Sequence, residues 1–352
     1  MRNYLLFVLF VVLSGTLMSQ DIHYSQFYNS PLNVNPGKTG IFNGDKRVNL
    51  SYRSQWNSVP VPWTTFSGSF DRKWYPKYGQ DYFWSGGILL NHDRNGEVTS
   101  LNLTNINLTG SWTKILNEQN LITIGALLGY ATRSFDQSSL TWDNQWNGLE
   151  FDPGRASGEQ ISNVGVNFLE SGLGLNYRWQ RSKRTKLDLG VGLYHVLEPN
   201  TSLFDSPGAD TDITLPRRLS LTGIGTFQVA SKLDIQLDAL AQFQGEYNEV
   251  ILGALGKIHV NQRRGKETEL HIGGGWRTSG DLFPVIAVQH KNFYLSANYD
   301  VNISDFTSFG LDNPVNPNIP NQHDTPTSFE MHFTYIISDV RPFDKVKVCP
   351  IF

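Results

Sequence analysis

Histidines, carboxylates and one cysteine are the side chains of this chain that could do acid–base or metal chemistry. The 352 residues contain eight histidines and the single cysteine Cys349. No His-Glu-x-x-His, His-x-His or Cys-x-x-Cys spacing brings metal ligands together. The Gly-x-Ser-x-Gly elbow that presents a nucleophilic serine is missing as well. The pattern predicts no catalytic residue, no bound metal and no cofactor.

One pair of carboxylates shares a strand face. Asp234 and Asp238 stand four residues apart, with Gln236 between them. One interpretation is an acid–base pair or an ion site. The other, which we favour, is two polar residues satisfied by neighbouring arginine, glutamine and water. Spacing does not exclude a hydrolase that assembles Ser, His and Asp from separate strands.

The composition narrows the class of protein. Charged residues make up 17% of the chain, below the roughly 25% that is typical of soluble domains. Hydrophobic residues make up 39% and aromatic residues 12%, which indicates a large folded body rather than disorder. A net charge of -3 offers no basic surface to nucleic acid, so no nucleic-acid partner is expected.

Hydrophobic residues recur at every second position through most of the chain. In 233–243, for example, Leu, Ile, Leu, Ala, Ala and Phe alternate with Asp, Gln, Asp, Leu and Gln. Such alternation over about 9–11 residues is typical of a membrane-spanning β-strand. No stretch has a convincing helical period. About fourteen such segments are expected, at 46–56, 63–74, 81–92, 104–116, 121–133, 171–181, 186–197, 217–229, 232–244, 249–260, 268–278, 282–290, 292–304 and 326–338.

The connections between these segments are sorted by length. If the first segment runs outward, the periplasmic side receives tight connections, such as 116–120, 181–185, 230–232 and 290–292. The outer side receives the three longest ones, 134–170, 198–216 and 305–325. This asymmetry and the even strand number are characteristic of outer-membrane barrels. We therefore predict an all-β fold, a single transmembrane antiparallel β-barrel of about 14 strands over 46–338. A soluble β-sandwich, the alternative, has no reason to sort its loops in this way.

Tryptophans mark the expected strand ends. Interfacial aromatic girdles of barrels belong at such positions. The residues are Trp63, Trp74, Trp84, Trp112 and Trp179.

The two ends of the chain differ from the barrel region. Residues 1–19 combine Arg2 with the apolar run 5–13, which is the pattern of a secretory signal peptide. The run is too short to span about 30 Å of hydrocarbon as a membrane anchor. Residues 20–45, which we call the leader, are rich in Asn, Pro and Gly and either plug the lumen or hang in the periplasm. Residues 339–352 are expected to form a periplasmic tail.

The longest outer loop contains a cluster of apolar residues. Trp142, Trp146 and Phe151 lie within 134–170 together with Leu149. Aromatic anchors of this kind are enriched in the hot spots of protein interfaces. One interpretation is a partner-binding site. The other is a cover over the barrel mouth, packed against Phe204 and Phe306 of the other long loops.

Short segments with recognisable patterns run in order through the chain. They are QDIHYSQFYNSPLNVNPGKTG at 20–40, Gly-Leu-Tyr-His at 192–195, Leu-Pro-Arg-Arg at 215–218, Trp-Arg-Thr at 276–278, Tyr-Asp at 299–300, Ser-Phe-Glu at 328–330 and Cys-Pro-Ile-Phe at 349–352. Together they resemble the PorP/SprF family of Bacteroidota outer-membrane proteins, which is linked to type IX secretion. The leader matches that family's pattern at Tyr24, Ser25, Asn29, Leu32, Asn35, Pro36 and Gly40. It departs from the family's Ala-Tyr-Ala at 37–39.

The resemblance implies a function that the residues alone do not reach. It implies a non-enzymatic barrel of the bacterial outer membrane. Such a barrel helps to export a large secreted adhesin, of the gliding-motility type, or anchors it at the cell surface through its C-terminal signal domain. Other type IX secretion components are implied as further partners. The residues by themselves indicate a barrel surrounded by outer-membrane lipid, and they leave open a porin or transporter for a small hydrophobic or polar solute.

Overall fold

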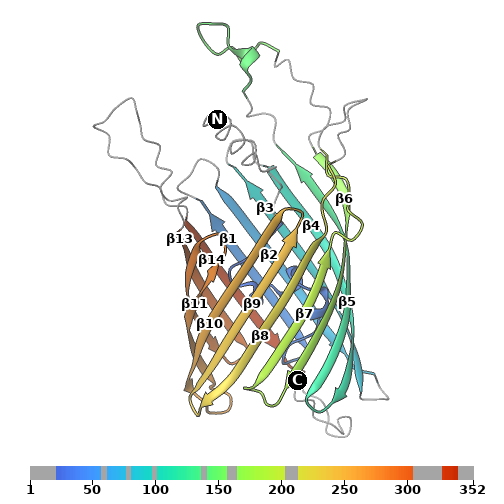
Figure 1. Cartoon of the computed structure of the whole chain (residues 1–352), viewed down its shortest axis with the longest axis vertical. Helices are drawn as coiled ribbons and strands as arrows, with labels where there is room; N and C mark the ends of the chain where they lie inside the picture. The colour runs from blue at the N-terminus through green and yellow to red at the C-terminus, as the bar shows by residue number, and fades with distance from the viewer. Residues whose placement is uncertain are drawn as a thin grey trace, which may run out of the picture.

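Fourteen antiparallel strands close into one barrel. The computed structural model describes residues 21–56, 62–76, 81–96, 101–135, 141–156, 165–202, 213–303 and 327–339. Each strand pairs with its neighbours in sequence, and β1 pairs with β14 to close the sheet (Figure 1). Closure leaves no strand edge whose backbone groups face lipid without a partner. The predicted barrel of about 14 strands is confirmed.

The strand bounds agree with the expected segments to within one residue at most ends. They are β1 (Lys46–Gln55), β2 (Trp63–Trp74), β3 (Tyr82–Asn95), β4 (Leu101–Asn117), β5 (Asn120–Ser134), β6 (Gly165–Gln180), β7 (Lys186–Tyr194), β8 (Arg218–Ala230), β9 (Leu233–Gln244), β10 (Tyr247–Asn261), β11 (Thr268–Arg277), β12 (Asp281–His290), β13 (Phe293–Asn302) and β14 (Thr327–Ile337). No helix in the described ranges is long and apolar enough to cross a membrane. The described helices are 3-10 turns of three residues each.

Alternate side chains face the lumen and the outside. In β9, Asp234 and Asp238 are buried inside the barrel while Leu237 is 51% exposed on its outer wall. The outward residues meet hydrocarbon, and the polar inward residues meet one another and the leader. The pattern that predicted the strands therefore also sets which side chains can form a site in the lumen.

Strand β6 begins earlier than expected, inside the predicted loop 134–170. It starts at Gly165 and pairs with β5 as far as Ser134. At 166–168 of this extension the apolar side chains point inward, since Val166 and Phe168 pack with Ala131 and Leu215. Asn167 points outward. Leu169 already points outward and Glu170 inward, so the polarity is reversed only at 166–168. This short reversal interrupts the lipid-facing pattern, and the prediction therefore places the start of the strand too late.

Tryptophans line one end of the barrel. Trp74 lies opposite Trp84 across β2 and β3, and Trp84 lies opposite Trp112 across β3 and β4. Trp74 and Trp84 are exposed on the outer wall, as residues of an interfacial girdle should be. This row lies at the end with the short turns, which we call the periplasmic end. The opposite end is called the outer end.

The loop lengths predict the orientation of the barrel in the membrane. Epitope tags inserted at Gly154 and at Asp312, of which the second lies outside the described residues, should react with antibody on intact cells. A tag at Lys183, in the turn between β6 and β7, should react only after the cells are opened. Labelling of the Lys183 tag alone on intact cells would reverse the orientation.

Candidate functional site

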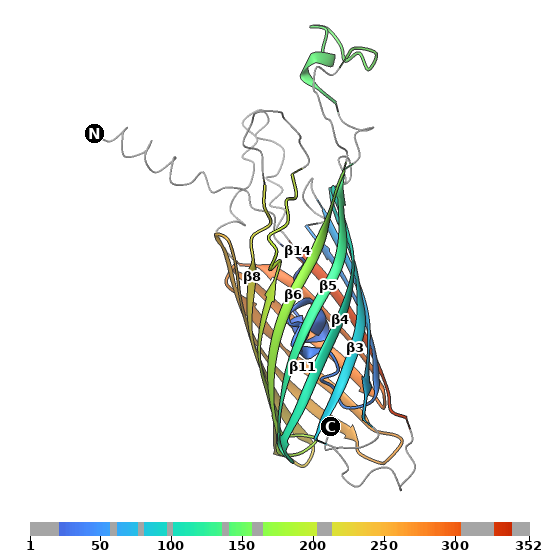
Figure 2. The ribbon, with the colours of Figure 1, turned by 90° about the vertical axis from the view of Figure 1, so that its right-hand side faces the viewer.

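The leader lies inside the barrel. Figures 1 and 2 show residues 21–45 enclosed by the strands in both views, and most of their side chains are buried. Three 3-10 helices shape the segment: η1 (Phe27–Asn29), η2 (Pro31–Asn33) and η3 (Pro36–Lys38). The Asn35 side chain caps η3 by accepting a hydrogen bond from the Gly37 N–H at 2.7 Å. Prolines at the start of η2 and η3 suit helix starts, where no backbone donor is needed.

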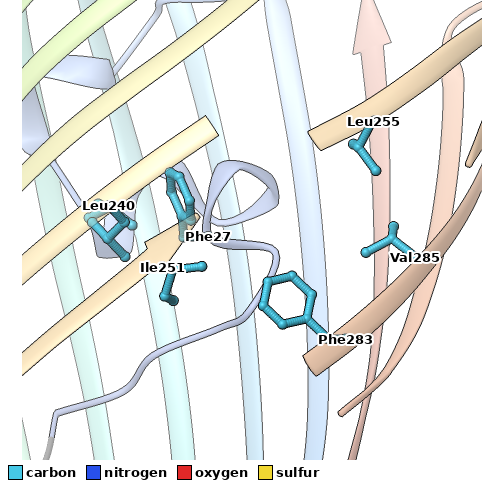
Figure 3. Packing of buried hydrophobic residues seen from close by; sticks show 7 residues of the cluster. Phe27, Leu240, Ile251, Leu255, Phe283 and Val285 are labelled. Carbon is cyan, nitrogen blue, oxygen red and sulfur yellow. The ribbon is translucent and has the colours of Figure 1, made fainter. Parts of the chain in front are cut away.

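Apolar residues of the leader pack against separate patches of the wall. Phe27 and Val34 contact a cluster from β9, β10 and β12 that includes Leu240, Ile251 and Phe283 (Figure 3). A second cluster joins Leu32 to Leu89, Leu127 and Tyr194. A third joins Ile41 to Phe83 and Leu121. These apolar positions in an otherwise polar lumen bury the hydrophobic residues of the leader, which favours the seated position.

Glycines of the wall make room for η3. A Cβ at Gly174 of β6 would overlap with Asn35 Oδ1 and the Gly37 nitrogen. A Cβ at Gly125 of β5 or at Gly192 of β7 would overlap with the backbone carbonyls of Pro36 or Val34. The leader backbone thus lies directly on three neighbouring strands, an approach that only glycine permits.

Two arginines and several carboxylates surround Ser25. The Glu330 carboxylate accepts hydrogen bonds from the Ser25 N–H at 2.8 Å and the Gln26 N–H at 3.2 Å. The Ser25 hydroxyl donates to Asp300 at 2.5 Å and accepts from Arg277 at 2.5 Å. Arg53 lies 3.1 Å from Glu330 and donates to the carbonyl of His23 at 2.8 Å. Because these charges are buried, each depends on its partners to offset the loss of water.

A second ionic cluster holds the first residue described. Asp21 lies 2.6 Å from His195 Nε2 and 3.0 Å from Arg218. His195 Nδ1 lies 2.8 Å from Glu170. Arg218 also donates to the carbonyl of Asn33 at 2.8 Å. One arginine thus joins two separate parts of the leader, at Asp21 and Asn33, to β8.

The Asp21–His195 contact predicts a pH window for the seating of the leader. Burial would lower the pKa of His195, but Asp21 and Glu170 raise it to about 9. Burial would raise the pKa of Asp21, but Arg218 and His195 hold it well below its usual range. Since the pKa of His195 is raised, its contribution is complete below about pH 6.5 and lost as the pH rises through the folded value. The contribution of Asp21 is present above about pH 4 and lost as the pH falls through its lowered pKa.

Protease protection of the leader's first residues should therefore fall near pH 9. In an NMR titration, the His195 ring should show a midpoint close to that value. The variant His195→Gln should lose the alkaline dependence. A wild-type midpoint near 6.5 would contradict the assignment.

A third set of bonds holds the end of the leader. Asp71 accepts from the Gly40 N–H at 2.8 Å and pairs with Arg47 at 2.7 Å. Lys73 donates to the carbonyl of Phe42 at 2.5 Å. These bonds attach residues 40–42 to β1 and β2, directly before the first strand begins.

The segments that carry the family resemblance converge on this site. Tyr24, Ser25, Asn35, Pro36 and Gly40 belong to the leader, and each contacts the wall. The wall residues that they or their neighbours meet include members of the later segments: Gly192, His195, Arg218, Arg277, Asp300 and Glu330. Neither the spacing nor the periodicity of the sequence indicates that these residues form a site. Inward-facing charges at strand positions within those segments are the signal that could have identified them.

The aromatic residues of the long outer loop form a separate small structure. Residues 141–156 contain η4 (Asp143–Gln145), a β-bridge between Trp146 and Phe151, and a hydrogen bond from the Asp152 N–H to the Gln145 carbonyl at 2.8 Å. Trp142 is half-buried, whereas Trp146 is 56% exposed and Leu149 89%. Phe204 and Phe306 lie outside the described residues. Whether they pack against this loop, as one interpretation requires, stays a prediction.

The carboxylate pair of β9 has ordinary partners. Asp234 lies 2.6 Å from Arg184 and 2.8 Å from His259. Asp238 accepts a hydrogen bond from Gln236 at 3.2 Å. These contacts agree with the interpretation that both aspartates are lumen residues whose carboxylates are paired with neighbouring side chains. Within the described ranges, no group of three or more His, Cys, Asp or Glu side chains could hold a metal ion.

Most of this chain matches the model of a known protein family. A model of the type IX secretion system membrane protein PorP/SprF matches residues 16–314. This chain belongs to the PorP/SprF family. Membership and the barrel fold together place this PorP/SprF protein in the bacterial outer membrane, in a family related to secretion rather than to an enzyme class.

Solved structures share the barrel with this PorP/SprF chain at low sequence identity. A mutant of TodX, the monoaromatic hydrocarbon channel of P. putida, aligns at 8% identity and a TM-score of 0.50, over 87% of this chain and 94% of that one. The Ralstonia pickettii toluene transporter TbuX aligns at 10% identity and a TM-score of 0.48, over 86% and 92%. No curated protein matches the sequence significantly. The similarity extends to the fold alone.

Proposed function

We propose that this PorP/SprF protein is a non-enzymatic barrel that helps to export a large secreted adhesin, or anchors it at the cell surface, through the adhesin's C-terminal signal domain. Family membership supports a role in type IX secretion. The observation that carries the proposal is the leader inside the lumen, attached to the wall by ionic clusters, apolar packing and backbone contact. A lumen occupied in this way favours a role for the outer surface over passage of a solute.

The outer loop is the surface that we propose for partner binding. Residues 141–156 form their own hydrogen-bonded turn and expose the apolar side chains of Trp146, Leu149 and Phe151. In Figures 1 and 2 this green segment lies beyond the outer ends of the strands. Exposed apolar groups held by a folded scaffold are typical of interaction sites. We assign Trp142 to the same site because it directly precedes η4, and its backbone N–H and carbonyl both bond to Gln145.

The double variant Trp142→Ala with Trp146→Ala is expected to release the surface partner. A true hot-spot anchor contributes on the order of 2 kcal/mol, so losing two should reduce retention of the partner by roughly a hundredfold or more. The measurement is co-purification of a large surface protein with the tagged barrel from native membranes, identified by mass spectrometry. Insertion of the variant barrel is checked by its heat-modifiable mobility in gels.

The matched control replaces tryptophans of the wall instead of the loop. Trp84→Ala with Trp74→Ala removes the same side chains from the girdle and should leave partner retention unchanged once insertion is equal. If the loop variant inserts normally and retains the partner at the wild-type level, the loop is not the attachment site. If no large protein accompanies the wild-type barrel, the proposed anchoring function is wrong.

A further inference from the structure

A cavity with a cationic lining lies between the leader and the periplasmic end of the barrel. Its volume is about 330 Å³, within the range of small-ligand pockets. The lining contains one carboxylate, Asp188, and six cationic side chains: Lys38, Arg47, Arg178, Lys186, Lys257 and Lys291. Lys291 is exposed in the turn between β12 and β13, so the cavity reaches the periplasmic mouth. We call this space the vestibule.

The two arginines of the vestibule are already neutralised. Arg178 pairs with Asp188 through two contacts, at 2.6 and 2.9 Å. Arg47 pairs with Asp71 in the same way, at 2.9 and 2.7 Å. The lining carboxylate is thus engaged by an arginine, and the charge that remains in the vestibule is that of the lysines.

The lysines lack such partners. Within the described part of the chain, the amino groups of Lys38, Lys186 and Lys257 have no carboxylate oxygen within 4 Å. Three carboxylates lie in electrostatic range of Lys257, but each is already contacted by an arginine, histidine or glutamine side chain. Lys186 and Lys257 also repel each other. Lys38 is buried, and Lys186 and Lys257 are half-buried. Ammonium groups withdrawn from water in this way without an anion are unfavourable, so the vestibule favours the entry of negative charge.

The same walls present unused hydrogen-bonding groups. Asn176 is 0% exposed and lines the vestibule, yet neither atom of its side-chain amide has a partner among the described residues. Thr226 Oγ1, buried on β8, also has none there. Buried polar atoms of folded proteins are nearly always satisfied by protein, water or ligand. Their position beside the lysines indicates a site that is completed by a hydrogen-bonding anion.

We propose that the vestibule binds an oxyanion, a phosphate or carboxylate group that enters from the periplasm. Lys38, Lys186 and Lys257 supply positive charge, and Asn176 and Thr226 supply hydrogen bonds. Lys291 stands at the mouth and attracts the anion. The group belongs either to a free small molecule or to an acidic side chain of a periplasmic protein. This inference does not depend on the proposed adhesin function.

Binding should also strengthen the seating of the leader. Lys38 belongs to η3 of the leader, whereas Lys186 and Lys257 belong to the wall. Burial lowers the pKa of Lys38 to about 8, and Arg178 and Arg47 act in the same direction against Asp188. An anion shared between Lys38 and the wall lysines offsets the unfavourable burial of the Lys38 charge and connects the leader to the wall. A ligand that binds only the seated state stabilises that state.

The test uses the full mature chain in lipid nanodiscs. Inorganic phosphate and a hexaglutamate peptide are titrated separately by calorimetry, against chloride at matched ionic strength. The cavity variant is Lys186→Met with Lys257→Met. The control variant is Lys183→Met with Lys232→Met, which removes the same charge from two periplasmic turns outside the vestibule. Folding of every variant is checked by heat-modifiable gel mobility.

We expect at least one probe to bind the wild-type chain and the control within about twofold of each other, and the cavity variant at least tenfold more weakly. Binding of phosphate identifies a free anion as the ligand, and binding of the peptide alone identifies an acidic side chain. The proposal is overturned if neither probe binds the wild-type chain. It is overturned equally if the cavity variant, correctly folded, binds as tightly as the control.

Discussion

Deletion of residues 21–40 is expected to turn a closed barrel into an open pore. The leader lies across the lumen, and its removal leaves a 14-stranded wall whose inward side chains are mostly polar. Barrels of 8 strands are filled by their own side chains, whereas those of 16–18 strands enclose water-filled channels. We expect steady conductance in planar bilayers to rise on the order of tenfold or more over that of the intact chain.

A single glycine replacement should have a similar effect without shortening the chain. Gly174→Leu places a side chain where Asn35 and Gly37 now lie, so the seated leader no longer fits. The matched control is Gly110→Leu on the outward face of β4, where an added Cβ meets nothing within 4 Å. We expect conductance and proteolysis of the leader to increase in Gly174→Leu and to stay at the wild-type level in the control.

A large, steady conductance of the intact protein would contradict the prediction that the leader closes the lumen. That result would favour the competing function, a transporter or porin for a small solute. Equal conductance of the intact and deleted chains, both low, would mean that other residues close the lumen.

Glu330→Gln is expected to destabilise the barrel more than any exposed charge substitution. The Glu330 carboxylate is fully buried, contacts Arg53 at 3.1 Å and accepts two backbone hydrogen bonds from the leader. After the change the nearest remaining carboxylate of Arg53 is Asp300 at 3.6 Å. Removing one member of a buried pair typically costs about 3–5 kcal/mol. Since Arg53 and Glu330 lie opposite each other where β1 meets β14, the loss acts on both barrel closure and the leader.

The free energy of unfolding in urea, measured in detergent micelles, checks this expectation. Asp339→Asn is the control, because the Lys46–Asp339 pair has a similar length of 3.0 Å but is partly exposed, with side chains 27% and 44% accessible. Exposed pairs contribute about 0–1 kcal/mol. Arg53→Met added to Glu330→Gln should restore part of the loss, since the uncompensated charge is gone. Equal, small losses for Glu330→Gln and the control would contradict the importance of the buried cluster.

The architecture of this protein is largely determined by local sequence. The period-two alternation of β9 fixes which side chains face lipid, because a strand turns successive residues to opposite faces. Loop lengths then sort the two ends of the barrel, because neighbouring antiparallel strands need only a short turn on one side. The reversed polarity of Phe168 and Asn167 at the start of β6 shows where this pattern stops describing the strand.

The contacts between the leader and the lumen wall, in contrast, depend on the tertiary structure. Ser25 and Glu330 are 305 positions apart, and Asp21 and His195 are 174 apart. A residue's inward position on its own strand does not reveal which leader atom it faces, because that depends on the closure of the sheet and the path of the leader through the lumen. The leader itself lacks any periodic pattern, since its three short turns are stabilised by contacts with the wall rather than by propensity. Sequence alone therefore determines the barrel and which residues face its interior. Only the folded chain decides that the leader lies in that interior, and the contact of the leader with β6 is the reason why residue 174 must be a glycine.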